Sequence, residues 1–380
     1  MDNSMKKIVN VIVRTMLVVV SLIIVLILVV VIYIQQPKFG QTPDGERWER
    51  IKKSSNYKNG SFQNRSHTPD LTEGVSYYAV MKEFLFIEKK RVKPSDTIPS
   101  TKTNLLNLDP EQNILVWFGH SSYFMQLDGK RILVDPVLSG AASPLAFTTR
   151  AFLGTDAYTV DDIPEIDYLF ISHDHWDHTD HETLLLLRQK IKRVICGLGT
   201  GEHFERWGYD KRIITEEDWD TKILLDSGFI AHTTTARHFS GRGLQRNKAL
   251  WTSFVLQTPS FQIFIGGDSG YDTHFAEIGN KFSQFDLVIL ENGQYDKSWK
   301  YIHMMPEEVL LAARDLNAKR LFPVHSAKFA LANHAWDEPL VKITEFNRGV
   351  NLPLVTPIIG ELVNMNDSTQ AFSNWWVDIR

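Results

Sequence analysis

The hydrophobic positions of this chain fall into two regions of different character. Near the N-terminus, residues 16–34 form one apolar run without a charged side chain. After Asp109, short apolar runs end in polar clusters, and stretches with helical spacing lie between some of them, notably at 180–191 and 306–316. Short runs rich in Val, Ile and Phe are typical of strands. The sequence therefore predicts β-sheets covered by helices. The expected strands lie within 114–120, 122–136, 167–173, 193–199, 253–268, 287–293 and 320–325.

The apolar run near the N-terminus is long enough to cross a bilayer. A helix rises ~1.5 Å per residue, and the hydrocarbon core is ~30 Å thick. The run is apolar on every face, exceeds the hydrophobic segment of an ordinary signal peptide, and is followed by no A-x-A site. We expect residues 1–36 to form an uncleaved single-pass anchor. Lys6, Lys7 and Arg14 precede the run, which favours a cell-membrane protein with its C-terminal region outside the cytoplasm.

Residues 37–109 are polar and rich in turn residues, with an amphipathic stretch at 77–92. A free linker is one interpretation. Aromatic residues such as Trp48, Tyr57 and Phe84 are numerous for a solvated tether, so we expect this extension to pack on a main domain at 110–380.

Composition narrows the function classes. The chain carries 41 Lys and Arg against 45 Asp and Glu, so nucleic acid is not an expected partner. A single cysteine, Cys196, excludes a disulfide framework and a Cys-rich metal site. No G-x-S-x-G motif marks a serine nucleophile.

The segment SHDHWDHTD at 172–180 concentrates potential metal ligands directly after an expected strand. His173 and His175, two apart in an extended segment, project to the same side. Asp177 and His178, in the turn that follows, can point at a neighbouring position. One short loop can thus serve two metal ions. With only 13 histidines in the chain, a chance cluster is a poor explanation.

This segment matches the signature H-x-[HED]-x-D-H of hydrolases with the metallo-β-lactamase fold. Further segments, among them WFGHSSYFMQLDG, ILVDPVLS, GGDSGY, HMMPEEV and PVHSAKFALAN, resemble the branch that contains N-acylphosphatidylethanolamine-hydrolysing phospholipase D and its bacterial relatives. The resemblance implies an α+β fold of four layers in αββα order, here preceded by a transmembrane helix.

The resemblance also implies a ligand set for two zinc ions per chain. His173, His175 and His238 would hold one ion, Asp177, His178 and His325 the other, and Asp268 would bridge them. Independently of the resemblance, His238, Asp268 and His325 each follow an apolar strand-like run. A set of nitrogen and oxygen ligands also leaves manganese or iron possible.

Three more residues match the family pattern. Asp135 is expected either to accept a hydrogen bond from a ligand imidazole or to stabilise a turn or cap. His120 touches the substrate or braces its loop. His303 contacts phosphate or protonates a leaving oxygen, or else caps a surface loop. Asp177, Asp268 and His303 are the residues expected to act in catalysis.

The function implied is that of a membrane-anchored phosphodiesterase of phospholipase D type, which acts on N-acylphosphatidylethanolamine-like lipids. Two ions ~3.5–4 Å apart hold a bridging hydroxide that attacks phosphorus. Two alternatives remain: a hydrolase of a soluble ester, lactone or phosphodiester, and a non-catalytic zinc-binding domain. The expected partners are the membrane and a lipid or small-molecule substrate.

Overall fold

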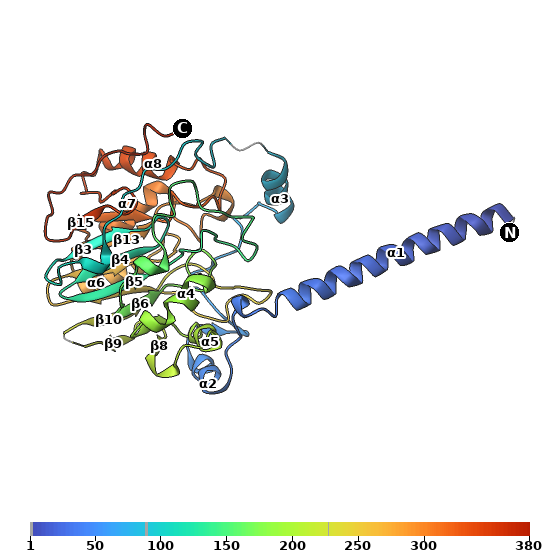
Figure 1. Cartoon of the computed structure of the whole chain (residues 1–380), viewed down its shortest axis with the longest axis horizontal. Coiled ribbons are helices and arrows are strands. Elements are labelled where there is room, and N and C mark those ends of the chain that lie inside the picture. The colour runs from blue at the N-terminus through green and yellow to red at the C-terminus, as the bar shows by residue number, and fades with distance from the viewer. Residues whose placement is uncertain (1–2, 88–89, 227) are drawn as a thin grey trace.

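The computed structural model describes residues 3–87, 90–226 and 228–380, and two sheets packed face to face form its body (Figure 1). The strand order is β15-β3-β4-β5-β6-β7-β8 in the first sheet and β14-β13-β12-β11-β10-β9 in the second. The first sheet contains β3 (Ile114–Trp117), β4 (Tyr123–Leu127), β5 (Lys130–Val134), β6 (Tyr168–Ile171), β7 (Val194–Gly197), β8 (Ile214–Glu217) and β15 (Leu362–Asn364). The second contains β9 (Lys222–Leu224), β10 (Ile230–Thr234), β11 (Ser253–Gln257), β12 (Gln262–Ile265), β13 (Leu287–Glu291) and β14 (Leu321–Val324).

Helices cover the outer face of each sheet. Leu184 of α4 (His181–Leu187) and Phe204 of α5 (Gly201–Arg206) are buried against the first sheet. Helices α6 (His274–Phe282), α7 (Pro306–Asp315) and α8 (Glu338–Asn347) pack on the second. The helices expected at 180–191 and 306–316 are α4, followed by a 3₁₀ turn, and α7. The four-layer αββα arrangement expected from the sequence is confirmed.

The core lies between the sheets and is rich in aromatic side chains. Phe170, Phe254 and Phe322, which belong to three different strands, are fully buried there. The C-terminal Trp375 and Trp376 also join this cluster. Both sheets combine antiparallel and parallel pairs, and the parallel pairs include β5 with β6 and β13 with β14. Because carboxyl ends of parallel strands meet at one edge, the loops after β5, β6, β12 and β14 gather at a common edge of the two sheets.

Helix α1 (Asn3–Tyr33) projects away from this body, and its apolar side chains are exposed (Figure 1). Its Ser4–Tyr33 portion is long and apolar enough to cross a membrane. It starts well before residue 16, where the expected span begins, because the polar residues ahead of the apolar run are helical too; residues 1–2 of the expected anchor lie outside the described part. The end of α1 is fixed by hydrogen bonds from Tyr33 Oη to Pro144 O (2.6 Å) and from Arg206 Nη2 to Gln35 O (2.7 Å).

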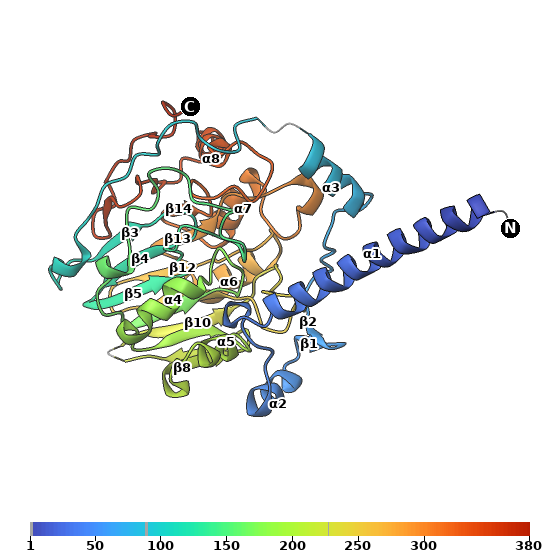
Figure 2. The same cartoon turned by 45° about the vertical axis from the view of Figure 1, so that its right-hand side comes forward.

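The segment after α1 lies along the body before it reaches α3 (Figure 2). It contains a 3₁₀ turn (Pro37–Phe39), α2 (Gly45–Lys53), β1 (Tyr57–Lys58), β2 (Ser61–Phe62) and α3 (Tyr77–Phe86). Ile51 and Phe62 are fully buried, and Arg47 pairs with Glu202, Glu205 and Glu216. By contrast, α3 buries no residue. Residues 88–89 of the expected amphipathic stretch lie outside the described residues, and the division at 36 and 109 stays a prediction.

Candidate metal centre

The loop between β6 and α4 carries four of the seven predicted ligands and is tightly braced. Asp180 caps α4 by accepting a hydrogen bond from Glu182 N (3.2 Å), which ends the loop after His178. Thr179 Oγ1 donates to His173 O (2.6 Å). The buried Arg242 donates to Asp174 O (2.9 Å) and Thr179 O (2.6 Å). The loop therefore presents its histidines in a fixed geometry.

Three imidazoles converge at one point of the site. His175 Nδ1 lies 2.9 Å from His173 Nε2 and 3.3 Å from His238 Nε2. His238 Nδ1 faces Ile302 O at 2.9 Å, so Nδ1 carries the proton and Nε2 offers its lone pair. Burial lowers the pKa of His173 and His238 well below the ordinary value, and that of His175 to about 4. Neutral, convergent imidazoles are the form that binds a metal cation.

A second cluster adjoins the first and contains His120, Asp177, His178 and His325. His178 donates Nδ1–H to Asp135 Oδ2 (2.9 Å), which leaves its Nε2 for the site. Burial opposes a charge on His178, but Asp268 and Asp177 outweigh burial and hold its pKa well above the ordinary value. Two sets of side chains thus form two adjacent positions.

Asp268 lies between the two clusters and turns one oxygen to each. Its Oδ2 is 3.8 Å from His173 Nε2 and 3.7 Å from His238 Nε2. Its Oδ1 is 3.2 Å from both His178 Nε2 and His325 Nδ1. Burial raises the pKa of Asp268 to about 6 against the opposing effect of His178. A carboxylate in this position can contact two cations at once.

The donor set fits a pair of bound cations. His178 Nε2 and Asp268 Oδ1 lie 3.2 Å apart but are not aligned as a hydrogen bond, and neither buried atom has another hydrogen-bond partner among the described residues. Buried polar atoms are normally satisfied, so such atoms aimed at a common point indicate a missing partner. Nitrogen and carboxylate ligands suit Zn²⁺ and other first-row ions. The buried clusters are consistent with a binuclear metal site.

Asp135 and His120 each contact the side chain of a predicted ligand. Besides His178, Asp135 accepts hydrogen bonds from Ser172 N (2.8 Å) and Ser172 Oγ (2.6 Å). His120 is fully buried, and its Nε2 lies 2.8 Å from Asp177 Oδ2. Of the roles weighed from the sequence, the geometry supports acceptance from an imidazole for Asp135 and bracing for His120.

His303 lies beside both clusters, and its main partner was missed by the sequence analysis. His303 Nδ1 is 2.5 Å from Glu291 Oε2, and Glu291 also accepts from Met304 N (2.8 Å). Glu291 is fully buried and ends β13. The strand-end pattern that singled out Asp268 and His325 applies equally to the ILENG segment, so the signal was present in the sequence.

The extension contributes a further contact that was not predicted. Asn64 pairs with the backbone of His238: its Nδ2 donates to His238 O (2.8 Å), and its Oδ1 accepts from His238 N (3.1 Å). Trp251 Nε1 also donates to Asn64 Oδ1 (3.0 Å). The extension thus fixes one predicted ligand.

A cavity of about 310 Å³ opens onto the clusters. The two clusters and His303 supply part of its wall, and Asp70 and Tyr77 of the extension supply another part. The remaining wall is largely apolar and includes Phe239, Trp299 and Leu331. A substrate with an apolar portion can therefore approach the polar centre from this side.

A family model described as the beta-lactamase superfamily domain matches residues 130–326, more than half of the chain. The chain therefore belongs to the beta-lactamase superfamily. Together with the metallo-β-lactamase fold and the buried His/Asp clusters, this makes it a metal-dependent hydrolase. The resemblance inferred from the motifs is confirmed.

Several relatives cover much of the chain. An uncharacterized protein of Mycobacterium tuberculosis is 32% identical over 85% of this chain and 87% of that protein. Two relatives are named N-acyl-phosphatidylethanolamine-hydrolyzing phospholipase D. The mitochondrial protein of Saccharomyces cerevisiae is 32% identical over 60% of this chain and 50% of that protein, and the Caenorhabditis elegans protein is 26% identical over 66% and 77%. A solved metallo hydrolase of Ignicoccus hospitalis shares the fold, with a TM-score of 0.53 and 19% identity over 66% of this chain and 97% of that one.

We expect about two transition-metal ions per chain in protein purified without chelator, since the side chains form two positions that share Asp268. Elemental analysis measures this directly. His303→Gln should retain both ions because His303 lies outside the predicted ligand set. One ion or none in wild-type protein under metal-replete conditions would contradict a binuclear centre.

Proposed function

We propose that this protein is a membrane-anchored phosphodiesterase of phospholipase D type that hydrolyses N-acylphosphatidylethanolamine-like lipids. The observation that carries the proposal is the position of Asp268, whose two oxygens face two adjacent clusters of buried ligand-type side chains at the base of a cavity. The names of the yeast and nematode relatives support this lipid class.

The proposed ligands follow the two clusters. His173, His175 and His238 hold one zinc ion, Asp177, His178 and His325 hold the other, and Asp268 is shared. When bound, such a pair activates water and stabilises charge on the attacking and leaving oxygens. Asp135 fixes the His178 tautomer, and His120 orients Asp177.

His303 is placed to act on the substrate. Glu291 fixes its Nδ1, so Nε2 remains for the ligand, and the His303 ring lies 5.3 Å from the His325 ring. Burial lowers the pKa of His303. Burial also raises the pKa of Glu291 well above its ordinary value. We propose that neutral Glu291 donates its proton in a hydrogen bond to Nδ1, so that His303 carries its own proton on Nε2 and donates it to a phosphate oxygen. When the leaving oxygen takes this proton, Nδ1 takes the proton of Glu291.

Two helices support a lipid substrate. The apolar α1 is proposed to cross the cell membrane, with the enzyme domain outside the cytoplasm, because Lys6, Lys7 and Arg14 precede or begin the span. Helix α3 exposes Tyr78 and Phe86 by more than three quarters, and Tyr77 of the same helix lines the metal cavity. Exposed apolar side chains beside the cavity fit a mouth that faces lipid.

The proposed function is tested by a substrate panel that spans N-acylated phospholipids, other phospholipids, lactones and soluble diesters. We expect the N-acylated phospholipid to be hydrolysed best, chelator to stop the reaction, and isotopically labelled water to place its oxygen on the phosphate-bearing product. Preference for a lactone or soluble diester would overturn the lipid assignment. Label on neither product would overturn hydrolysis by water.

A further inference from the structure

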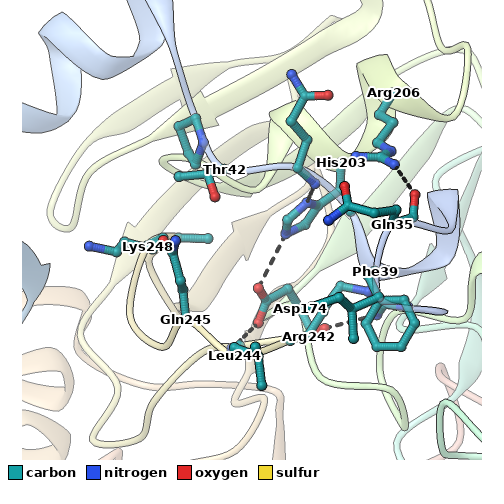
Figure 3. A pocket seen from close by; sticks show the side chains of 17 residues that line it. Gln35, Phe39, Thr42, Asp174, His203, Arg206, Arg242, Leu244, Gln245 and Lys248 are labelled. Atoms are coloured by element: carbon teal, nitrogen blue, oxygen red, sulfur yellow. Dashed lines mark hydrogen bonds and ion pairs between the residues drawn. The ribbon is translucent and has the colours of Figure 1, made fainter. Parts of the chain in front are cut away.

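The ligand loop at 172–180 has a second side, which faces the foot of α1. Asp174 lines a cavity of about 400 Å³ on that side, together with Phe39 and Arg242 (Figure 3). His175 and Asp177 line the metal cavity instead, and the two cavities share none of their described lining residues. The loop thus separates the metal cavity from the end of the apolar helix.

Arg242 ties the ligand loop to the turn that follows α1. Its Nη1 donates to Asp174 O (2.9 Å) and Thr179 O (2.6 Å), and its Nε donates to Lys38 O (2.9 Å). Asp174 and Thr179 enclose the segment 175–178, which carries three of the predicted ligands. One guanidinium therefore fixes both ends of this segment relative to the turn after α1.

Aromatic rings connect the same parts of the molecule. The Cζ atom of Arg242 lies 4.0 Å from the centre of the Trp176 ring and 5.3 Å from that of the Trp207 ring. Trp176 stands between two predicted ligands in the chain, and the Phe39 ring meets it edge-on, with 5.2 Å between the ring centres. Trp207 Nε1 donates to Pro37 O (2.7 Å). The turn after α1 thus contacts the ligand loop both through Arg242 and through Phe39.

The burial of Arg242 is unusual for a cationic side chain. Arg242 is 4% exposed and forms no ion pair among the described residues, and its Nη2 has no hydrogen-bond partner there. Burial of a guanidinium without a carboxylate partner costs free energy, which the three carbonyl contacts and the two rings offset. An apolar side chain of similar volume would fill the space without this cost. Packing alone therefore does not account for an arginine at this position.

We propose that Arg242 is a positioning residue of the metal centre, and that the turn Pro37–Phe39 holds it in place. Metal ligands bind only within narrow limits of distance, and replacement of the groups that orient them typically costs about 10–100-fold in metal affinity. Arg242 belongs to neither ligand cluster and acts through the backbone of the ligand loop. The inference rests on the proposed ligand loop, but not on the lipid substrate or on insertion of α1 into a membrane.

The test measures how fast full-length, metal-loaded protein in detergent releases metal to a chromophoric chelator, and it records the visible spectrum of the Co²⁺-loaded protein. Arg242→Met removes the donors and keeps an apolar side chain. Arg206→Met is the matched control, because Arg206 lines the same cavity and donates to Gln35 O (2.7 Å) but contacts no described residue of the ligand loop. Ile343→Ala, in the core cluster outside the second sheet, controls for a general loss of stability, and melting temperatures are recorded for every variant.

We expect Arg242→Met to release metal about tenfold faster or more and to change the Co²⁺ spectrum, and Phe39→Ala to have the same effects to a smaller extent. Arg206→Met and Ile343→Ala should match the wild type in both measurements. A release rate of Arg242→Met equal to that of either control overturns the proposal, and an unchanged rate in Phe39→Ala overturns the part assigned to the turn.

If Arg242→Met does not fold, Arg242→Lys takes its place with the same expected result. The lysine side chain ends in a single nitrogen, which cannot bridge the carbonyls of both the loop and the turn. A release rate of Arg242→Lys equal to the wild-type rate then overturns the proposal. Neither measurement depends on hydrolysis, so failure of the substrate panel leaves this result intact.

Discussion

Replacement of Asp268 by Asn is expected to lower kcat for the hydrolysed substrate by about a thousandfold or more. Asp268 turns one oxygen to each cluster, so the amide weakens both positions. A loss of ~4 kcal/mol of transition-state stabilisation corresponds to about three orders of magnitude in rate. The substitution preserves shape and adds no buried charge, so the fold should persist.

Steady-state kinetics, metal content and thermal unfolding should be measured together on Asp268→Asn. Asp272→Asn provides the control for loss of a nearby carboxylate, because Asp272 accepts from Thr273 N (2.8 Å) and faces Arg237 but belongs to neither cluster. We expect Asp272→Asn to keep its metal and most of its kcat. A kcat for Asp268→Asn close to that of the control would refute the shared-carboxylate assignment.

Deletion of residues 1–36 should reduce activity on substrate in vesicles by about a hundredfold or more, and change activity on a soluble short-chain analogue little. A tether raises the effective concentration of the partner at the membrane, and avidity of this kind amounts to ~10²–10⁴. The contacts of α2 and Asn64 lie beyond the deletion and remain. Parallel assays of wild-type and truncated protein on vesicles and on the soluble analogue give the ratio of the two activity losses.

An unrelated apolar helix fused at residue 37 should restore the vesicle activity, because the proposed role of α1 is attachment. Equal losses on both substrates would show that α1 acts on folding and not on substrate access. Protease added to intact cells should digest the enzyme domain if it lies outside the cytoplasm; full protection would reverse the proposed orientation.

The sequence predicted those features that depend on local pattern. The ligand loop at 172–180 and the strand-end positions of Asp268 and His325 follow from apolar runs that end in polar residues, and the superfamily fold follows from the motif. Glu291 also stands at the end of an apolar strand-like run, but Glu is a common residue type, so the sequence alone did not single it out. Its role depends on the approach of His303 from another segment.

The features of the site that the sequence did not predict depend on long-range contacts. Asn64 contacts His238, 174 positions further along the chain, and no local sequence pattern predicts a contact over such a separation. The sequence left two roles open for each of His120 and Asp135, and the choice between them depends on which side chain each residue contacts. In the structure these are Asp177 and His178, which a sequence pattern does not specify.

The contact between Asn64 and His238 also bears on the order in which the protein is made. At ~5–20 residues per second, roughly ten to fifty seconds separate synthesis of Asn64 from that of His325. Ile51 and Phe62, buried in the finished protein, have no complete surface to cover them until Leu198, Trp219 and Trp251 have been made. The two ligand clusters are complete only after His325 has been synthesised, which is near the end of the 380-residue chain. We therefore expect metal loading to follow the synthesis of His325, the last of the predicted ligands along the chain.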